Sequence, residues 1–170
     1  MRLHLVDINP AVVDALASAF APHPEVEVVC DNILHIASHC LVSPANSYGY
    51  MDGGIDADYS QFFGPALQIS VQDAIHRRPE GFLPVGAALA ITTGHERIPY
   101  MIIAPTMEMP EEVPASHAGR ALRAVLRLIA QQPHLGTDIY CPGLTTHTGH
   151  APPEEAAATM QAAYSHWLQS

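Results

Sequence analysis

Basic side chains are scarce in this chain. Lys and Arg together account for 7 of the 170 residues, against 17 Asp and Glu, and the formal net charge at pH 7 is −10. Nonspecific affinity for DNA or RNA comes mainly from neutralising phosphates with positive side chains, so this composition disfavours a nucleic-acid partner. A ligand that carries phosphate would instead be held by backbone N–H groups and by the positive ends of helices.

Cysteines are few and odd in number, which argues against a disulfide framework. Each of the three, Cys30, Cys40 and Cys141, lies in or beside an apolar, strand-like run. We therefore predict buried thiols in a reducing compartment, and a cytoplasmic location.

Long hydrophobic runs are also absent. No apolar stretch approaches the roughly 20 residues that a membrane-spanning helix needs. The first residues alternate as a strand, without the basic segment and apolar stretch of a signal peptide. We expect no membrane association.

Length and pattern predict one α/β domain that spans residues 1–170. Apolar runs predict strands at residues 3–8, 25–30, 85–93, 100–105 and 137–141, and one that ends near Ser43. Helical periodicity predicts helices at residues 10–20, 58–77, 115–132 and 153–168, the second broken or kinked at Gly64-Pro65. Strands that alternate with helices, and a sheet covered on both faces, indicate a three-layer α/β/α sandwich.

The last two helices have clear inward faces. In the helix at residues 115–132 the apolar positions recur at three- and four-residue spacing: Ala118, Leu122, Val125, Leu126 and Ile129. In the final helix we expect four side chains to face the core: Ala157, Met160, Tyr164 and Trp167.

Residues 41–57 form the stretch around which the chain is organised, and they predict a strand, a loop and a helix start. The pair Gly53-Gly54 lets a backbone approach a ligand closely and direct N–H groups at it. The helix that follows adds partial positive charge at its N-terminus. This arrangement favours a phosphate-bearing ligand, although glycines at such a place are also common as simple turn formers.

The order of residues in this loop says more than its glycines. Pro-Ala-Asn-Ser followed by Gly-Gly-Ile-Asp, with Asn46 and Asp56 ten positions apart, resembles the first ligand loop of macro domains, which bind ADP-ribose. In the hydrolytic branch of that family the loop carries an Asn and an Asp at this separation. The resemblance implies that Asn46 and Asp56 are catalytic, and that Ala45, Gly53, Gly54 and Ile55 contact the ligand.

A second segment of the resemblance concerns the adenine. In macro domains a Gly-Asp-Ile segment follows the corresponding strand, and its Asp accepts a hydrogen bond from the adenine amino group. Asp31 matches that position, and Asn32 and Ile33 are implied as neighbouring contacts. Cys30 replaces the Gly and Asn32 precedes the Ile, which departs from the pattern. Without the resemblance, Asp31 is equally well a polar strand-end or capping residue.

The loop after the last strand matches the family segment that wraps the diphosphate and the distal ribose. Gly143, Leu144, Thr146 and Gly149 agree with it, whereas Thr145, His147 and His150 stand where glycines are usual. A Thr hydroxyl can replace a backbone donor and a protonated His can pair with phosphate, so binding can survive these changes or be weakened by them. The ligand contacts implied here are Gly143, Leu144, Thr145, Thr146, His147, Thr148 and Gly149. A metal site formed by His147, His150 and Cys141 is an alternative that lacks a fourth ligand.

The resemblance implies a three-layer fold with a mixed central sheet, and a function in ADP-ribose chemistry. The leading hypothesis is a domain that binds ADP-ribose and hydrolyses it from mono-ADP-ribosylated protein, or hydrolyses O-acetyl-ADP-ribose. Asp56 would orient water and stabilise positive charge at the sugar, and Asn46 would hold a ribose hydroxyl. We expect no cofactor and no metal, and the partners are ADP-ribose or ADP-ribosylated protein.

Several alternatives stay open at this point. Asn46 could satisfy loop backbone groups and Asp56 could cap the following helix, in which case the domain would be a reader that binds without turnover. A protein that processes phosphate or nucleotide ends on nucleic acid is disfavoured by the charge. The opening Leu-Val-Asp-Ile-Asn-Pro also looks like the acidic strand end of a methyltransferase. No glycine-rich turn precedes it, so Asp7 is taken as a strand-end residue.

Overall fold

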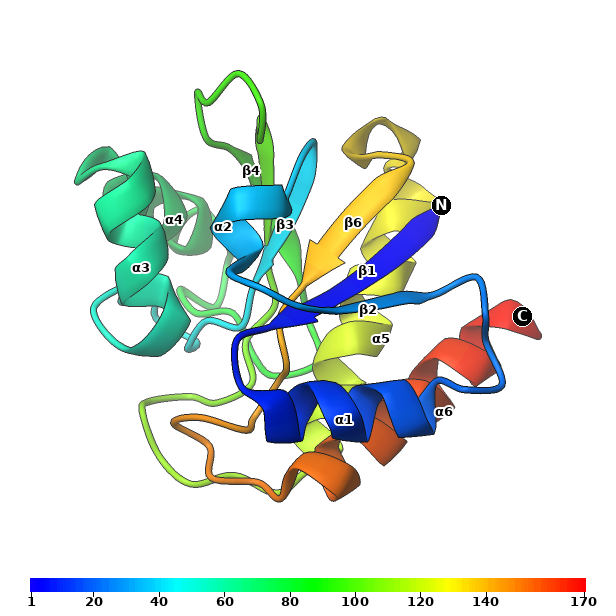
Figure 1. The fold of residues 1–170 in the computed structure, drawn as a ribbon. Helices are drawn as coiled ribbons and strands as arrows, with labels where there is room; N and C mark the ends of the chain where they lie inside the picture. Colours follow the sequence, from blue (N-terminus) through cyan, green and yellow to red (C-terminus); the bar gives the residue numbers. More distant parts are fainter.

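The computed structural model describes residues 1–170, and all six strands pair into one sheet (Figure 1). The sheet has the order β2-β1-β6-β3-β5-β4. Its strands are β1 (Arg2–Asp7), β2 (Glu27–Cys30), β3 (Cys40–Ser43), β4 (Leu89–Thr92), β5 (Tyr100–Ile103) and β6 (Asp138–Cys141). Only β4 is antiparallel to its neighbour. The predicted α/β class and the mixed sheet are therefore confirmed.

Helices cover both faces of this sheet (Figure 1). They are α1 (Pro10–Ala19), α2 (Ile33–Ile36), α3 (Gly54–Phe63), α4 (Ala66–His76), α5 (Ser116–Gln131) and α6 (Pro153–Leu168), with a short 3-10 helix at Pro133–Leu135. Helices α1, α5 and α6 pack on one face, and α2, α3 and α4 lie on the other. This is the predicted three-layer sandwich.

The period-2 alternation of the strands divides the core in two. In β1, Leu3 and Leu5 belong to a cluster of 28 buried residues beneath α1, α5 and α6, whereas Val6 belongs to a cluster of 15 beneath α2, α3 and α4. Cys40 and Leu41 of β3 divide in the same way. Helix α5 buries all five of the apolar residues predicted for its inward face, and α6 buries all of its four except Trp167, which is partly buried against the same cluster.

Some boundaries differ from the prediction, and the reasons are local. The helix expected at residues 58–77 is two helices, because Gly64 adopts φ +94° and Pro65 follows it. The first of the two begins at Gly54, the second residue of the glycine pair, and Gly53 is its N-cap. Helix α2 was not predicted, because its four residues are too few to show a period. Its N-cap is Asn32, whose side chain accepts a hydrogen bond from the N–H of Leu34.

The prediction of three buried thiols was wrong for Cys30. Cys40 and Cys141 are buried, but Cys30 is exposed. It is the last residue of β2, and β2 is an edge strand that has no neighbour on one side. None of the helices is both long and apolar enough to cross a membrane.

The sheet order determines where the two predicted loops lie. Strands β6 and β3 are parallel neighbours, and β1 is parallel to β6 on its other side. The carboxyl ends of parallel strands lie at the same edge of a sheet, and this edge is where α/β proteins commonly bind ligands. The loops that follow β1, β3 and β6 therefore converge there.

A cleft at the carboxyl edge of the sheet

A cleft of about 540 Å³ lies at this edge. Five segments contribute to its lining: those that follow β1, β2 and β5, the β3–α3 loop and the β6–α6 loop. Every residue that the sequence assigned to ligand binding or catalysis lines it except Leu144, whose side chain packs in the larger core cluster. Those lining it are Asp31, Asn32, Ile33, Ala45, Asn46, Gly53, Gly54, Ile55, Asp56, Gly143, Thr145, Thr146, His147, Thr148 and Gly149.

Asn46 is buried and organises the β3–α3 loop. Its Oδ1 accepts hydrogen bonds from the N–H groups of Tyr48 (3.1 Å) and Tyr50 (3.2 Å), and its Nδ2 donates to the carbonyl of Tyr50 (2.9 Å). An amide nitrogen carries two N–H donors, and Asn46 uses one of them within the loop. The structural role considered for Asn46 is thus present, and one donor is left for a ligand.

Asp56 lies in the first turn of α3 and is 7% exposed. Its Oδ1 accepts a hydrogen bond of 2.6 Å from the hydroxyl of Ser43, at the end of β3. Its Oδ2 has no hydrogen-bond partner in the chain, and Asp56 is one of the residues that line the cleft. Burial raises the pKa of Asp56 to about 7, against the opposing effect of the Ser43 hydrogen bond. The carboxyl group therefore changes its charge near neutral pH.

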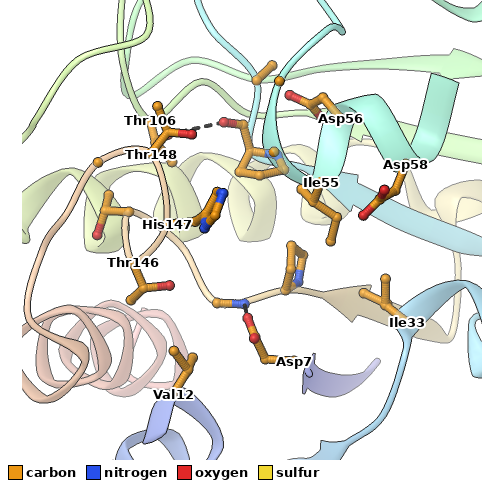
Figure 2. A pocket seen from close by; sticks show the side chains of 18 of the residues that line it. Asp7, Val12, Ile33, Ile55, Asp56, Asp58, Thr106, Thr146, His147 and Thr148 are labelled. Atoms are coloured by element: carbon orange, nitrogen blue, oxygen red, sulfur yellow. Dashed lines mark hydrogen bonds between the residues drawn. The ribbon is translucent and has the colours of Figure 1, made fainter. Parts of the chain in front are cut away.

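The N-terminus of α3 opens into the cleft without a side-chain cap. Gly53 is the N-cap residue and makes no capping hydrogen bond, so the first N–H groups of α3 have no intrahelical acceptor. The two loops meet here, because a Cβ on Gly54 would lie 3.4 Å from Cδ2 of His147 and 3.5 Å from Oγ1 of Thr148. Figure 2 shows His147 in the space between Thr146 and Ile55.

The β6–α6 loop keeps a glycine-like backbone although glycine is replaced in it. Thr145 has φ +65° and His150 has φ +53°, both in the left-handed region that favours glycine. Gly149 has no such φ, but a Cβ there would lie 2.7 Å from the carbonyl oxygen of Thr145. Thr145 and His150 therefore hold backbone conformations that glycine adopts more readily.

Asp7 is the most informative residue that the sequence did not assign to the site. It lines the cleft, and its Oδ2 accepts a hydrogen bond from the N–H of Gly143 (3.1 Å), as Figure 2 shows. Its Oδ1 accepts from the N–H of Asn9 (2.9 Å). A Cβ on Gly143 would lie 2.8 Å from Oδ2 of Asp7 and 2.6 Å from Cγ1 of Val12, so only glycine fits this approach. Asp7 ties the second loop to β1, across 136 residues of sequence.

The lining of the cleft is strongly acidic. It contains five carboxyl groups, no Lys and no Arg, and a single His: Asp7, Asp31, Asp52, Asp56, Asp58 and His147. An anionic ligand in this cleft would depend on backbone N–H groups and on that one imidazole.

The residues considered for a metal site do not gather. Cys141 is buried and its thiol donates to the carbonyl of Pro142, whereas His147 and His150 are exposed. Nδ1 of His150 lies 3.2 Å from a carboxylate oxygen of Glu112 instead. No three or more His, Cys, Asp and Glu side chains form a group that could hold a metal ion.

Comparison with known proteins gives a family model and several relatives. The model described as "Macro domain" matches residues 42–160. An uncharacterised protein of Aquifex aeolicus is 33% identical over 138 residues, which make up 80% of this chain and 78% of that protein. The residues matched by the family model include both loops of the cleft, and leave β1, α1 and β2 outside.

Solved structures of similar fold are macrodomains. That of Mycobacterium tuberculosis DarG has a TM-score of 0.68 at 19% identity, covering 80% of this chain and 87% of its own. A mutant macrodomain of Oceanobacillus iheyensis with ADP-ribose has a TM-score of 0.68 at 19% identity, covering 79% and 73%. Two further structures of the latter carry substitutions of an Asn and of an Asp that are ten positions apart in its sequence.

Proposed function

Because this chain belongs to the macro-domain family, we propose that its cleft binds ADP-ribose. The observation that carries the proposal is the convergence of the β3–α3 and β6–α6 loops on one cleft, into which α3 directs an uncapped N-terminus. Free N–H groups at a helix N-terminus bind phosphate oxygens without a basic side chain. This matters in a cleft whose lining has neither Lys nor Arg.

We place the three parts of the ligand along the cleft as follows. The adenine lies at the end lined by Asp31 and Ile33, and the diphosphate lies between the first turn of α3 and the β6–α6 loop. The distal ribose then lies beside Asn46 and Asp56. In the Oceanobacillus iheyensis macrodomain the substituted Asn and Asp have the separation that Asn46 and Asp56 have here.

We further propose that the domain hydrolyses either the bond that joins ADP-ribose to a side chain of a mono-ADP-ribosylated protein or the acetyl ester of O-acetyl-ADP-ribose. In the protein-linked substrate, ionised Asp56 accepts a proton from the attacking water through Oδ2 and stabilises the positive charge that grows on the sugar carbon, while the bond from that carbon to the protein side chain breaks and the side chain leaves with its electron pair and takes up a proton from solvent. In O-acetyl-ADP-ribose the activated water attacks the acetyl carbon, and the ribose hydroxyl leaves. The second N–H of Asn46 donates to a ribose hydroxyl and fixes the sugar beside that water. Ser43 holds Oδ1 of Asp56, so the free oxygen has one orientation.

The binding proposal is tested by calorimetry with ADP-ribose, ADP and adenosine. We expect ADP-ribose to bind most tightly, because it alone reaches Asn46 and Asp56. Equal affinities for all three ligands would reduce the cleft to a general nucleotide pocket, and no binding of ADP-ribose would end the proposal.

The hydrolysis proposal is tested by release of ADP-ribose from a mono-ADP-ribosylated protein and by turnover of O-acetyl-ADP-ribose. Asp56→Ala should abolish turnover and leave the affinity for ADP-ribose within about tenfold of the wild-type value. A tenfold change in affinity corresponds to about 1.4 kcal/mol of binding free energy. Asp73→Ala, on the exposed face of α4 and outside the cleft, is the matched control.

A non-catalytic reader is the second candidate function. It is favoured by the three hydrogen bonds that Asn46 makes to its own loop, because they give Asn46 a structural role that requires no reaction. Tight binding of ADP-ribose with no turnover of either substrate by the wild-type protein would select it.

A further inference from the structure

His147 is the only residue in the lining of the cleft that can carry a positive charge. It lines the cleft, and its side chain is exposed. A sugar diphosphate keeps both phosphates ionised between pH 5 and pH 8, and the five carboxyl groups of the lining oppose it. The backbone N–H groups stabilise the phosphates with partial charges only. A full positive charge on the imidazole would therefore change the affinity for a diphosphate strongly.

The position of the imidazole fits this role. Cδ2 of His147 lies against Gly54, the first residue of α3, where the free N–H groups of the helix point into the cleft. No hydrogen bond from the ring to another side chain is drawn in Figure 2, where the ring lies in the open space between Thr146 and Ile55. A phosphate at the end of α3 would therefore meet the helix N–H groups on one side and the imidazole on the other.

We propose that protonated His147 pairs with the diphosphate and makes the affinity for ADP-ribose increase as the pH falls from 8 to 5.5. The inference depends on the proposed binding of ADP-ribose and adds the group that determines its pH dependence. Histidine is the residue type that ordinarily gains its charge in this range. The chain would then hold its ligand more tightly in acidic conditions.

Other titratable groups face the same space and have to be separated from His147. The carboxyl groups come from β1, from the segment after β2, and from the first loop and α3: Asp7, Asp31, Asp52, Asp56 and Asp58. On its own loop His150 pairs with Glu112, outside the lining. Asp56 loses its negative charge as the pH falls through about 7, which would also favour an anion, so the test is carried out in an Asp56→Asn background.

The experiment is calorimetric titration of ADP-ribose at pH 5.5, 6.5 and 8.0, with adenosine as a ligand without phosphate. In Asp56→Asn we expect about tenfold tighter binding of ADP-ribose at pH 5.5 than at pH 8.0, since a charge-assisted hydrogen bond to phosphate is roughly of this strength. Adding His147→Gln should remove this difference between the two pH values. His147→Arg should give the tight binding at both pH values. His150→Gln is the matched control and should keep the pH dependence.

The outcomes separate this inference from the proposed function. Binding of ADP-ribose whose pH dependence is the same with and without His147, or a His147→Gln effect that is equal at all pH values, overturns the inference and leaves the proposed function standing. A pH dependence of equal size for adenosine also overturns it, because adenosine has no phosphate to pair. Absence of ADP-ribose binding at every pH overturns the proposed function, and the inference with it.

Discussion

Burial of the Asp56 carboxylate lowers the free energy of unfolding at neutral and basic pH, and Asp56→Asn should remove this loss. This carboxyl group has a pKa near 3.8 in the unfolded chain, and burial raises it to about 7 in the folded protein. Between these two values the unfolded chain is ionised while the folded protein holds a proton. The stability associated with Asp56 is therefore fully present below pH 3.8, decreases as the pH rises toward 7, and is lost above that.

The size of this effect follows from the difference between the two pKa values. One pKa unit corresponds to 1.36 kcal/mol, so a difference of about three units gives about 4 kcal/mol. Asp56→Asn has no charge to bury, and its Oδ1 can still accept the hydrogen bond from Ser43. We expect the variant to be about 2 to 4 kcal/mol more stable than the wild type at pH 8, and about equal at pH 4. For a chain of this length the gain at pH 8 is about 10 °C in Tm.

The same substitution should abolish hydrolysis, because the amide cannot accept the proton of the attacking water. In His147→Gln, where binding should no longer vary with pH through that imidazole, kcat/KM should rise about tenfold per pH unit up to about pH 7 and then level off, since only ionised Asp56 is active. Urea denaturation at pH 4, 6 and 8 measures the stability of both proteins, and the difference between them cancels the titration of all other groups. A variant no more stable than the wild type at pH 8, or a difference that does not change with pH, would refute this reasoning.

Two further predictions concern packing and exposure. Gly143→Ala places a Cβ 2.6 Å from Cγ1 of Val12, so it should lower the free energy of unfolding by about 1 to 3 kcal/mol in urea denaturation and weaken ADP-ribose binding at least about tenfold. A Cβ on Gly53 would meet no atom within 4 Å, so Gly53→Ala should lower the free energy of unfolding by less than about 1 kcal/mol. Equal losses of stability for the two variants would contradict the packing argument. Iodoacetamide at pH 8 should label Cys30 alone, because Cys40 is buried and its pKa is raised to about 12 by burial. Intact mass would show a single adduct, whereas several adducts on the native protein would contradict the assigned burial.

Much of the fold could be read from the sequence because its signals are local. The amphipathic pattern of α5 and the Gly64-Pro65 break are properties of adjacent residues, and the structure has them where they were predicted. Helix α2 was missed because four residues contain barely one helical turn. Cys30 was misjudged because the apolar run of β2 does not say that the strand lies at an edge of the sheet.

The candidate site was predictable where a motif carried it and not where it depended on sheet order. Asn46 and Asp56 belong to one continuous loop, so their spacing could be recognised. Leu144 belongs to the same kind of motif, but its side chain packs in the hydrophobic core. A motif does not show which of its side chains face the ligand and which face the core. Asp7 reaches the second loop only because β1 is inserted beside β6, and nothing in the six residues of that strand shows this neighbour.

The central claim is that the β3–α3 and β6–α6 loops together hold one sugar diphosphate. It is tested most directly by a crystal structure of the protein with ADP-ribose. We predict the diphosphate between the first turn of α3 and the β6–α6 loop, with the distal ribose within hydrogen-bond distance of Asn46 and Asp56. Ligand bound elsewhere, or seated in the cleft with its phosphates away from α3, would contradict the account.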